Sequence, residues 1–399
     1  MNTQKIKTPP NWQQVKLGDI GKVSMCKRVF KHETFSQGPI PFYKISTFGK
    51  IADSFISEDL FEKYKNNYPY PKKGEVLISA SGTIGRLVVF NGEKSYFQDS
   101  NIVWISNSQN KVLNKFLEYV YTKTRWISTD GGIISRLYNN DLRSIKFILP
   151  PLPEQHRIVS ILETWDSAIE KLSKKIKLKK QLKKGLMQKL LTGDVRFPGF
   201  SGEWKMVKLG SLVDVVSGGT PSTTNEKFWN GEIPWITPTE ITKLKDRFIE
   251  DTRKHITEAG LKKSSATKIP PMSLILCSRA TVGACAINLK EITTNQGFKN
   301  LVPKKIDIYF LYYLIKTKKN NLVCISSGST FLEFSKKDIQ KMKVFSPSQE
   351  EQKAIANILN TSDHEIDILQ QKLEELKKQK KYLLNKLVTG EIRTPESIN

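Results

Sequence analysis

The sequence is poor in acidic residues and cysteines, and it lacks any long apolar run. Asp and Glu number 39 among 399 residues, against 64 Lys and Arg. The four cysteines are scattered and form no CxxC pair, which excludes a disulfide framework. No stretch approaches the roughly 18 apolar residues of a membrane-spanning helix, and the first residues lack the apolar segment of a signal peptide. We therefore expect a soluble, cytoplasmic protein that does not bind membranes.

Signatures of common catalytic sites are missing as well. The sequence contains no Gly-x4-Gly-Lys-Ser/Thr phosphate loop, and Gly82-x-x-Gly85 is too short for a dinucleotide fingerprint. The four histidines do not cluster with cysteines at metal-ligand spacing. None of the Pro-Pro pairs has the neighbours of the Asn/Asp-Pro-Pro-aromatic loop that amino-methyltransferases use. We therefore predict no catalytic residue, no bound metal and no cofactor on this chain.

The chain carries a large positive charge. The formal net charge is +25, while 38% of the residues are hydrophobic and 10% are aromatic. Such a chain can bury real cores, so it is not a disordered basic tail. The surplus of cations is costly in self-repulsion unless a polyanion screens it, and nucleic acid is the first candidate for that polyanion.

An internal repeat organises the sequence. Residues 154–162 (EQHRIVSIL) align with residues 351–359 (EQKAIANIL), a shift of 197 residues (351 minus 154). The same shift aligns residues 191–196 (LTGDVR) with 388–393 (VTGEIR). Earlier, W-x-x-VKLG occurs at Trp12 and again at Trp204, and other short matches keep the same order. The order is therefore globular unit, helix, globular unit, helix.

Both helical segments have start signals, stop signals and a heptad pattern. Each begins near a Glu-Gln pair, the second inside the capping-box pattern Ser348-Gln-Glu-Glu351, and each ends at a Thr-Gly that can form a left-handed cap. Apolar residues recur between these signals at alternating steps of three and four, which predicts a coiled-coil seam. The predicted seam residues are Ile158, Leu162, Trp165, Ile169, Leu172 and Ile176 in the first helix, and Ile355, Leu359, Ile366, Leu369, Leu373 and Leu376 in the second.

The two seams are expected to pair with each other inside one chain. The alternatives are packing of each helix on its own globular unit, and pairing in a homodimer. An approximate two-fold relation between the repeats makes the helices antiparallel. Two lysines, Lys183 and Lys380, occupy the same seam position, and an antiparallel partner would bring them near Asp363 and Asp166 respectively. Such polar seam pairs can fix the register of a coiled coil.

The predicted fold class is α+β. Two similar globular units with compact sheets are separated by two long antiparallel helices that form an intramolecular coiled coil with a pseudo-two-fold repeat. Short β-rich runs, such as residues 75–79 and 87–90, alternate with turn residues, and residues 113–121 and 308–316 are predicted to be helical. The predicted boundaries are 1–150 for the first globular unit, 151–196 for the central helix, 197–347 for the second unit, 348–393 for the C-terminal helix and 394–399 for a tail.

Several segments resemble the specificity subunit of type I restriction-modification enzymes, over almost the whole chain. They are residues 149–155 (LPPLPEQ), 204–210 (W-x-x-VKLG), 217–221 (SGGTP), 229–236 (WNGEIPWI) and 294–298 (TNQGF). The first unit departs from this pattern, with residues 24–27 (SMCK) and 97–100 (FQDS) at the matching positions, and the second helix starts after one Pro fewer.

The resemblance implies a division of labour. The two globular units would be target-recognition domains, each reading one half of a bipartite, asymmetric site in double-stranded DNA. The helix pair would set the gap between the half-sites and dock the partner subunits. Two modification subunits would methylate adenine with S-adenosylmethionine, and motor/restriction subunits would hydrolyse ATP with Mg. This chain would be non-catalytic.

We predict base contacts in loops between strands, because loops can vary without disturbing a sheet. The candidates in the first unit are Tyr43, Lys44, Ser46, Ser81, Thr83, Arg86 and Arg136, and those in the second are Thr237, Thr239, Arg279, Thr281, Asn295, Lys299 and Ser329. Gly85 and Gly283 are expected to allow tight turns, and Trp12, Trp204 and Trp235 to be core aromatics. The central helix is rich in lysine, and Lys174, Lys177 and Lys184 are candidates for phosphate contacts.

Two other functions stay open on the sequence alone. The chain could serve a combined methylase-nuclease partner, or act in modification only. It could also be a coiled-coil scaffold whose basic surface binds RNA or acidic proteins.

Overall fold

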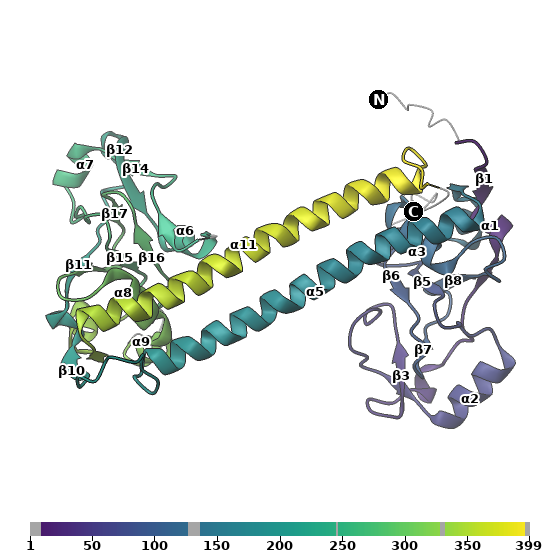
Figure 1. The fold of residues 1–399 in the computed structure, drawn as a ribbon, viewed down its shortest axis with the longest axis horizontal. Helices are drawn as coiled ribbons and strands as arrows, with labels where there is room; N and C mark the ends of the chain where they lie inside the picture. Colours follow the sequence, from purple (N-terminus) through teal and green to yellow (C-terminus); the bar gives the residue numbers. More distant parts are fainter. Residues whose placement is uncertain (1–8, 127–135, 245, 328–331, 396–399) are drawn as a thin grey trace. The chain divides into compact units, whose positions relative to one another are not determined.

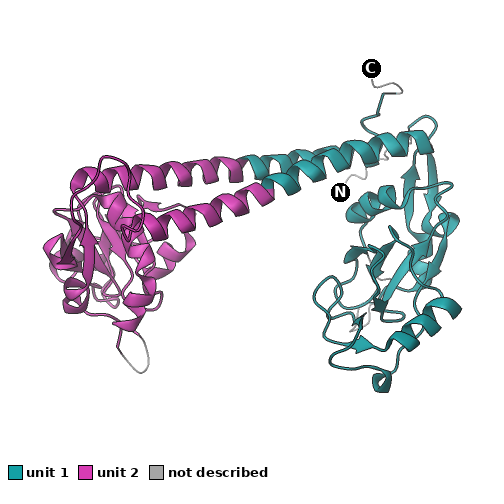
Figure 2. Ribbon diagram, turned by 60° about the horizontal axis from the view of Figure 1, so that its bottom comes forward, with its two compact units in different colours: residues 1–172, 372–399 teal, residues 173–371 magenta. Residues whose placement is uncertain are grey.

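The computed structural model describes residues 9–126, 136–244, 246–327 and 332–395. The chain forms two compact units: unit 1 comprises residues 1–172 and 372–399, and unit 2 comprises residues 173–371 (Figure 2). Each unit contains a globular α+β part and a portion of each of two long helices. The predicted mixed fold class with two similar globular parts is thereby confirmed.

The elements of the globular part of unit 1 are, in chain order, β1 (Gln13–Lys16), α1 (Leu17–Ile20), β2 (Lys22–Ser24), η1 (Lys31–Glu33), β3 (Ile40–Tyr43), β4 (Phe55–Ile56), α2 (Glu58–Asn67), β5 (Val76–Ser79), β6 (Leu87–Val89), β7 (Tyr96–Phe97), β8 (Ile102–Ser106), α3 (Asn114–Lys123), α4 (Asn139–Ser144) and β9 (Lys146–Leu149) (Figure 1).

A four-stranded antiparallel sheet in the order β2-β8-β5-β6 holds this globular part together. Its strand β5 is buried along its whole length. Val76 and Ile78 belong to one core and Leu77 belongs to another, as the alternation of side chains along a strand requires. A second sheet, β4-β3-β7, contains one antiparallel and one parallel pair, and β1 pairs with β9.

The globular part of unit 2 repeats this plan with one further strand. Its elements are β10 (Lys205–Lys208), η2 (Leu209–Ser211), β11 (Val213–Ser217), η3 (Glu226–Phe228), β12 (Trp229–Ile236), α6 (Pro238–Lys243), β13 (Phe248–Ile249), β14 (His255–Ile256), α7 (Glu258–Lys262), β15 (Leu274–Leu276), β16 (Cys285–Asn288), β17 (Thr293–Thr294), β18 (Lys299–Pro303), α8 (Ile308–Thr317), α9 (Lys319–Cys324), α10 (Lys336–Lys341) and β19 (Lys343–Ser346).

The sheets of unit 2 correspond to those of unit 1. The order β11-β18-β15-β16 matches β2-β8-β5-β6, and β14-β12-β17 matches β4-β3-β7. The strand β13 adds a parallel neighbour to β16 at the sheet edge. Leu274 and Leu276 of β15 face one core while Ile275 faces the other, as in β5. The expected helices at residues 113–121 and 308–316 are α3 and α8.

The two long helices are α5 (Leu152–Leu190) and α11 (Gln349–Val388), which have 39 and 40 residues. Each is followed by a glycine in the left-handed conformation, Gly193 with φ +82° and Gly390 with φ +73°. The predicted glycine stop signals are therefore confirmed. Among the described residues, no helix has both the length and the apolar composition needed to cross a membrane.

Within each unit the two helices run antiparallel. In unit 1, Ile158 near the start of α5 shares a core with Leu387 near the end of α11. In unit 2, Leu190 at the end of α5 shares a core with Ile355 and Leu359 near the start of α11. The predicted seam residues are all buried or half-buried, namely Ile158, Leu162, Trp165, Ile169, Leu172, Ile176, Ile355, Leu359, Ile366, Leu369, Leu373 and Leu376.

Both predicted polar seam pairs are present. Lys380 pairs with Asp166 inside unit 1, and Lys183 pairs with Asp363 inside unit 2. Unit 2 has an additional pair between the helices, in which the Lys179 ammonium lies 2.8 Å from Glu365.

The repeated Glu-Gln and Thr-Gly-x-x-Arg segments meet in one cluster per unit. In unit 1, the buried carboxylate of Glu154 accepts hydrogen bonds from the Trp12 indole at 2.9 Å and from the Arg393 guanidinium. In unit 2, Glu351 accepts from the Trp204 indole at 3.1 Å and from Arg196. We call these the Glu–Trp–Arg clusters. Each ties the start of one long helix to the segment that follows the other.

The glutamine of each Glu-Gln pair also joins its helix to the globular part. The Gln155 side chain accepts from the Leu113 amide at 2.9 Å and donates to the carbonyls of Pro150 and Lys111. Gln352 likewise accepts from the Asp307 amide at 2.8 Å and donates to the carbonyl of Pro347. These residues therefore place α3 and α8 next to the starts of α5 and α11.

The capping-box expectation at residues 348–351 was right for one of its two bonds. The Ser348 hydroxyl accepts a hydrogen bond from the Glu351 amide. The Glu351 carboxylate, however, is occupied by Arg196 and Trp204 instead of returning to the start of the helix. A charged guanidinium is a stronger partner for a buried carboxylate than one backbone amide is.

Candidate nucleic-acid interface

In unit 1, two parallel strands end side by side and bring two predicted loops together. Strand β3 pairs with β7 in parallel, with Tyr43 opposite Phe97, and their rings stack at 5.7 Å. The next residue, Gln98, donates its amide to the Tyr43 carbonyl at 3.0 Å, and its side chain accepts from the Ile45 amide at 2.9 Å. The loop after β3 and the loop before β8 therefore form one edge of the globular part.

The turn between β5 and β6 joins the same edge. The Ser81 hydroxyl donates to the Asn101 side chain at 2.8 Å, and the backbone of Ser81 pairs with that of Arg136. The Arg136 guanidinium lies 3.4 Å from the Ser100 carbonyl. We call this surface, formed by residues 43–46, 81–83, 98–101 and 136, the unit 1 loop edge. It contains most of the residues predicted for this unit.

The predicted residues of the unit 1 loop edge differ in how free their side chains are. Ser46 and Thr83 are exposed. The Lys44 ammonium pairs with the Asp53 carboxylate at 2.9 Å, and both side chains are in contact with solvent. Arg86 is held inside the unit, because its guanidinium donates to the Phe48 carbonyl at 2.9 Å. Its geometry supports a role in holding the loop of residues 44–50 against the turn.

Unit 2 has an equivalent surface after β12 and β17, formed by residues 237–239, 279–283, 295–299 and 333, which we call the unit 2 loop edge. These strands are also parallel, and the Asn295 amide donates to the Ile236 carbonyl at 3.0 Å. The Thr237 amide and hydroxyl both donate to one oxygen of Glu240, at 2.9 and 3.0 Å, so Thr237 caps α6. Thr239, two residues on, is exposed. The capping role leaves the Thr237 hydroxyl less available to a ligand than Thr239.

A partly buried ion pair supports the rest of the unit 2 loop edge. The Lys299 ammonium lies 3.1 Å from a carboxylate oxygen of Glu333, and the Lys299 side chain is only 10% exposed. The backbone of Glu333 pairs with that of Arg279. Lys299 is therefore engaged within the protein, whereas Arg279 lies on the turn itself. The predicted Ser329 lies outside the described residues.

The glycines that were expected to allow tight turns both adopt the left-handed conformation, but their surroundings differ. Gly85 has φ +80°, and a Cβ on it would lie 2.1 Å from the Trp126 ring. Gly283 has φ +83°, and a Cβ on it would lie 3.2 Å from the Lys319 side chain. An indole therefore covers the turn in unit 1, and a flexible cation lies beside it in unit 2.

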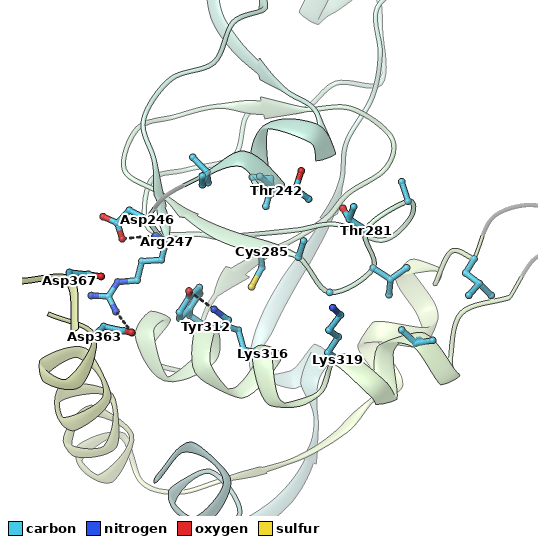
Figure 3. Close-up of a pocket in the computed structure, with 18 residues that line it drawn as sticks. Thr242, Asp246, Arg247, Thr281, Cys285, Tyr312, Lys316, Lys319, Asp363 and Asp367 are labelled. Carbon is cyan, nitrogen blue, oxygen red and sulfur yellow. Dashed lines mark hydrogen bonds and ion pairs between the residues drawn. The ribbon is translucent and has the colours of Figure 1, made fainter. Parts of the chain in front are cut away.

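A cavity of about 1010 Å³ adjoins the turn of unit 2 (Figure 3). Thr281 lies on its wall, and its hydroxyl is buried without a hydrogen-bond partner among the described residues. Lys316 and Lys319 face the cavity from α8 and α9, while Arg247 and Asp363 meet on its other side. The cavity thus joins the predicted turn to two lysines that the sequence did not single out.

The predicted lysines of α5 are all exposed. Lys177 and Lys184 also line a shallow groove of about 400 Å³ on this helix. Lys174 directly follows Ser173, which is another residue of the groove lining. The exposed side chains of Leu178 and Leu182 lie in the same stretch. This part of α5 therefore presents both cations and apolar groups to solvent.

Sequence reasoning missed three residues that organise the loop edges, namely Gln98, Asn101 and Glu333. Gln98 lies inside the FQDS segment and Asn101 directly follows it, and in the sequence this segment stands out only as a departure from the second repeat. Glu333 lies in a loop for which no matching segment was found in the sequence of the first unit. The three tryptophans are core aromatics as predicted: Trp12 and Trp235 are buried, and Trp204 packs against the core of unit 2. Throughout the described ranges, no group of three or more His, Cys, Asp or Glu side chains could hold a metal ion.

Comparison with known proteins identifies the family. The model of the type I restriction modification DNA specificity domain matches twice, at residues 9–180 and 201–378. A Haemophilus influenzae protein assigned as a type I restriction enzyme specificity subunit, S.HindORF215P, is 56% identical over 164 residues. That match spans 41% of this chain and less than half, 43%, of the relative.

Other similarities extend over nearly the full length. The type I restriction enzyme MjaVIII specificity subunit of Methanocaldococcus jannaschii is 25% identical over 97% of this chain and 94% of its own. The crystal structure of the type I restriction-modification system S subunit from M. genitalium has the same fold, with a TM-score of 0.57, 16% identity and coverage of 97% and 98%. With a matching domain in each repeat, this chain belongs to the family of type I restriction-modification specificity subunits.

Proposed function

We propose that this chain is the DNA-reading subunit of a type I restriction-modification complex, and that each unit reads one half of a bipartite target in double-stranded DNA. The observation that carries this proposal is the repeated loop edge. Both units place a strand end, a glycine turn and a polar loop together, but with different side chains. Two similar surfaces with different chemistry fit two half-sites of different sequence.

The polar groups of the loop edges suit base recognition. The exposed Ser46, Thr83 and Thr239 offer hydroxyls, and the half-buried Arg136 and Arg279 offer paired donors. Asn295 is half-buried, and its side-chain oxygen accepts from the Gly297 amide at 2.9 Å, which leaves its NH2 group as a donor. Arginine pairs with guanine and asparagine with adenine in the major groove. Lys316 and Lys319, beside the turn of unit 2, are suited to phosphate contacts, which supply affinity without sequence information.

The long helices are proposed to set the gap between the half-sites and to dock partner subunits. The exposed Lys174, Lys177 and Lys184 of α5 are candidates for contacts with the unread DNA in the gap. The solvent face of α11 carries Glu374 and Glu375 together with the exposed apolar Ile368 and Tyr382. A face of mixed charge with exposed apolar side chains is better suited to a protein partner than to DNA.

Catalysis is proposed to belong to other chains of a cytoplasmic complex. Two modification subunits would methylate adenine with S-adenosylmethionine, and motor/restriction subunits would use ATP and Mg. The role of this chain would be to choose the site, with no cofactor and no catalytic residue of its own.

The direct experiment maps adenine methylation in the host genome with and without this chain. One bipartite motif with two different halves should lose its methylation when the chain is deleted, and re-expression should restore it. A methylome that does not change, although the modification subunit is expressed, would refute the proposal. Cleavage or methyl transfer by the isolated chain would refute its non-catalytic role.

A further inference from the structure

Each unit contains a triad of Tyr, Asp and Lys that the Glu–Trp–Arg clusters do not include. In unit 1, the Tyr119 hydroxyl donates to one oxygen of Asp166 at 2.8 Å, and Lys380 binds the other oxygen. In unit 2, the Tyr313 hydroxyl donates to one oxygen of Asp363 at 2.6 Å, and Lys183 binds the other. We call these the Tyr–Asp–Lys triads.

Each triad joins three separate elements. The tyrosine comes from the globular part, on α3 or α8. The aspartate comes from the long helix that directly follows this globular part, and the lysine comes from the antiparallel helix. Because the two oxygens of one carboxylate bind two different elements, moving any one of the three elements breaks a hydrogen bond.

The tyrosines of the triads are buried and stay protonated. Tyr119 and Tyr313 are 3% and 0% exposed, and burial together with the adjacent aspartate raises the pKa of each phenol far above its usual range. The phenol is therefore a donor at every physiological pH. The Lys380 and Lys183 ammonium groups also lie over these rings, at 5.5 and 5.2 Å from the ring centres.

In the triad of unit 2 a second cation hydrogen-bonds the tyrosine and the aspartate, whereas among the described contacts of unit 1 Lys115 only lies over the Tyr119 ring, at 5.4 Å from its centre. Arg247, which precedes the extra strand β13, donates to the Tyr313 hydroxyl at 2.6 Å and to Asn360 at 2.8 Å. It also donates to Asp363 at 3.3 Å (Figure 3). Replacing one residue of the triad should therefore disturb the position of the helices more in unit 1 than in unit 2.

We propose that the Tyr–Asp–Lys triads are positioning devices that fix the register of the helix pair and the angle of each globular part on it, and so decide how strictly the protein measures the gap between half-sites. This inference rests on the proposed function. Any other register leaves a half-buried charge without its partner, which is costly. A slip of one helical turn is about 5.4 Å, more than the roughly 3.4 Å rise of one base pair. The triads thus act on the length scale at which spacers differ.

The test compares spacer preference in triad variants with that in a matched control. The full chain, assembled with its modification subunits, first selects its sites from a random DNA pool, which defines the wild-type half-sites and spacer. Lys380→Met and Asp166→Asn are then measured on DNA with spacers from two base pairs shorter to two longer. Lys377→Met is the control, because Lys377 is on the same helix but pairs with Glu374 of that helix, at 2.8 Å.

The triad variants should keep the half-sites but lose spacer discrimination. The preference for the native spacer over spacers one base pair longer or shorter should fall about tenfold, which is the lower end of the effect of losing one charge-assisted hydrogen bond. The control should keep the wild-type preference, and the double variant with Asp166→Lys and Lys380→Asp should recover much of it. Lys183→Met should have a smaller effect, since Arg247 still holds Asp363.

The outcomes separate this inference from the proposed function. If the wild-type complex selects no bipartite site, the proposed function fails. If it selects one, and folded Lys380→Met and Asp166→Asn retain the wild-type spacer preference, the positioning role is overturned. Should these variants fail to fold, Tyr119→Phe decides the question, because it removes only a hydroxyl. An unchanged spacer preference in Tyr119→Phe then overturns the role, and a relaxed one supports it.

Discussion

Arg393 donates two hydrogen bonds to the buried carboxylate of Glu154, at 2.7 and 2.8 Å, although the two residues are 239 positions apart in sequence. Arg196 makes the same pair of bonds to Glu351, at 2.8 and 2.7 Å. In both cases the glutamate begins one long helix and the arginine follows the other. The most recognisable repeated motifs of the sequence therefore have an architectural role: they join the ends of the helix pair inside each unit.

Removing the arginine should destabilise unit 1. In Arg393→Gln the Glu154 carboxylate, 4% exposed, stays buried without its cation, and we expect a loss of about 2–3 kcal/mol in the free energy of unfolding. Urea denaturation followed by tryptophan fluorescence measures it. The control is Lys386→Gln, which removes a solvent-exposed ion pair with Glu391 near the same helix end and should cost clearly less, because water and salt screen exposed charges. Equal losses in both variants would contradict the assignment.

The same cluster should make unit 1 sensitive to acid. Burial alone would raise the pKa of Glu154, but hydrogen bonds from Arg393 and Trp12 hold it below its ordinary value of 4.5. The unfolded chain therefore binds this proton more readily, so the stabilisation is complete above pH 4.5 and is lost as the pH falls through the folded pKa. Glu154→Gln should unfold with a shallower pH dependence than the wild type below pH 4.5, in urea titrations at a series of pH values. Parallel curves would argue against it.

The two glycine turns should respond differently to the same substitution. Alanine at either position pays about 1–2 kcal/mol for the left-handed backbone. Gly85→Ala must also displace the Trp126 ring, whereas the closest atom to a Cβ at Gly283 belongs to the flexible Lys319 side chain, at 3.2 Å, and its other neighbours lie at ordinary contact distance. We therefore expect Gly85→Ala to be more destabilising by about 1–3 kcal/mol. Thermal or urea unfolding of the two variants tests this directly, and a larger loss in Gly283→Ala would be inconsistent with the packing described.

The lysines of α5 should contribute to binding without affecting specificity. If Lys174, Lys177 and Lys184 contact phosphates, replacing all three with Gln should weaken binding to every DNA sequence alike. It should also reduce the slope of log K against log salt concentration by about 2–3. Changing Lys372, Lys377 and Lys378 of α11 to Gln removes the same charge and serves as the control. An unchanged slope in the α5 variant would leave these lysines without a role in DNA binding.

Each loop edge should control one half of the target. Arg136→Gln should alter or abolish recognition of one half-site only, and Arg279→Gln should alter the other, each by about 1–3 kcal/mol of base discrimination. Arg86→Gln should lower stability instead, because its guanidinium holds the Phe48 carbonyl. Site selection by the assembled complex reads out both halves at once. Changes in the same half-site from Arg136→Gln and Arg279→Gln would contradict the division of labour.

Local patterns predicted the elements of this protein well. The heptad steps, the glycine stop signals and the repeat were sufficient to expect α5, α11 and their antiparallel pairing, including the ion pairs at Asp166 and Asp363. The triad tyrosines could have been found too, because Phe116-Leu-x-Tyr119 and Phe310-Leu-x-Tyr313 match in the two repeats. A residue that repeats at the same place in both halves is visible in one sequence alone.

The side-chain partners inside the loop edges could not be predicted in this way. Arg86 and Lys299 have the chemistry of DNA-contacting residues, but their polar groups are already bound to Phe48 and Glu333. Whether a polar side chain is free or occupied depends on atoms that approach from distant segments, and no periodicity encodes that approach. Glu333, for example, reaches Lys299 from a loop that follows α9.

The amino-acid order of this chain thus specified two similar α+β units, two heptad helices and their direction, since these follow from side-chain periodicity and backbone conformation within a few turns. Folding settled which polar side chains of the loop edges are already occupied, and which turn is covered by an indole or left beside a cavity. Those outcomes depend on packing between segments that are separate in the sequence, where a difference of one ångström decides whether a hydrogen bond forms.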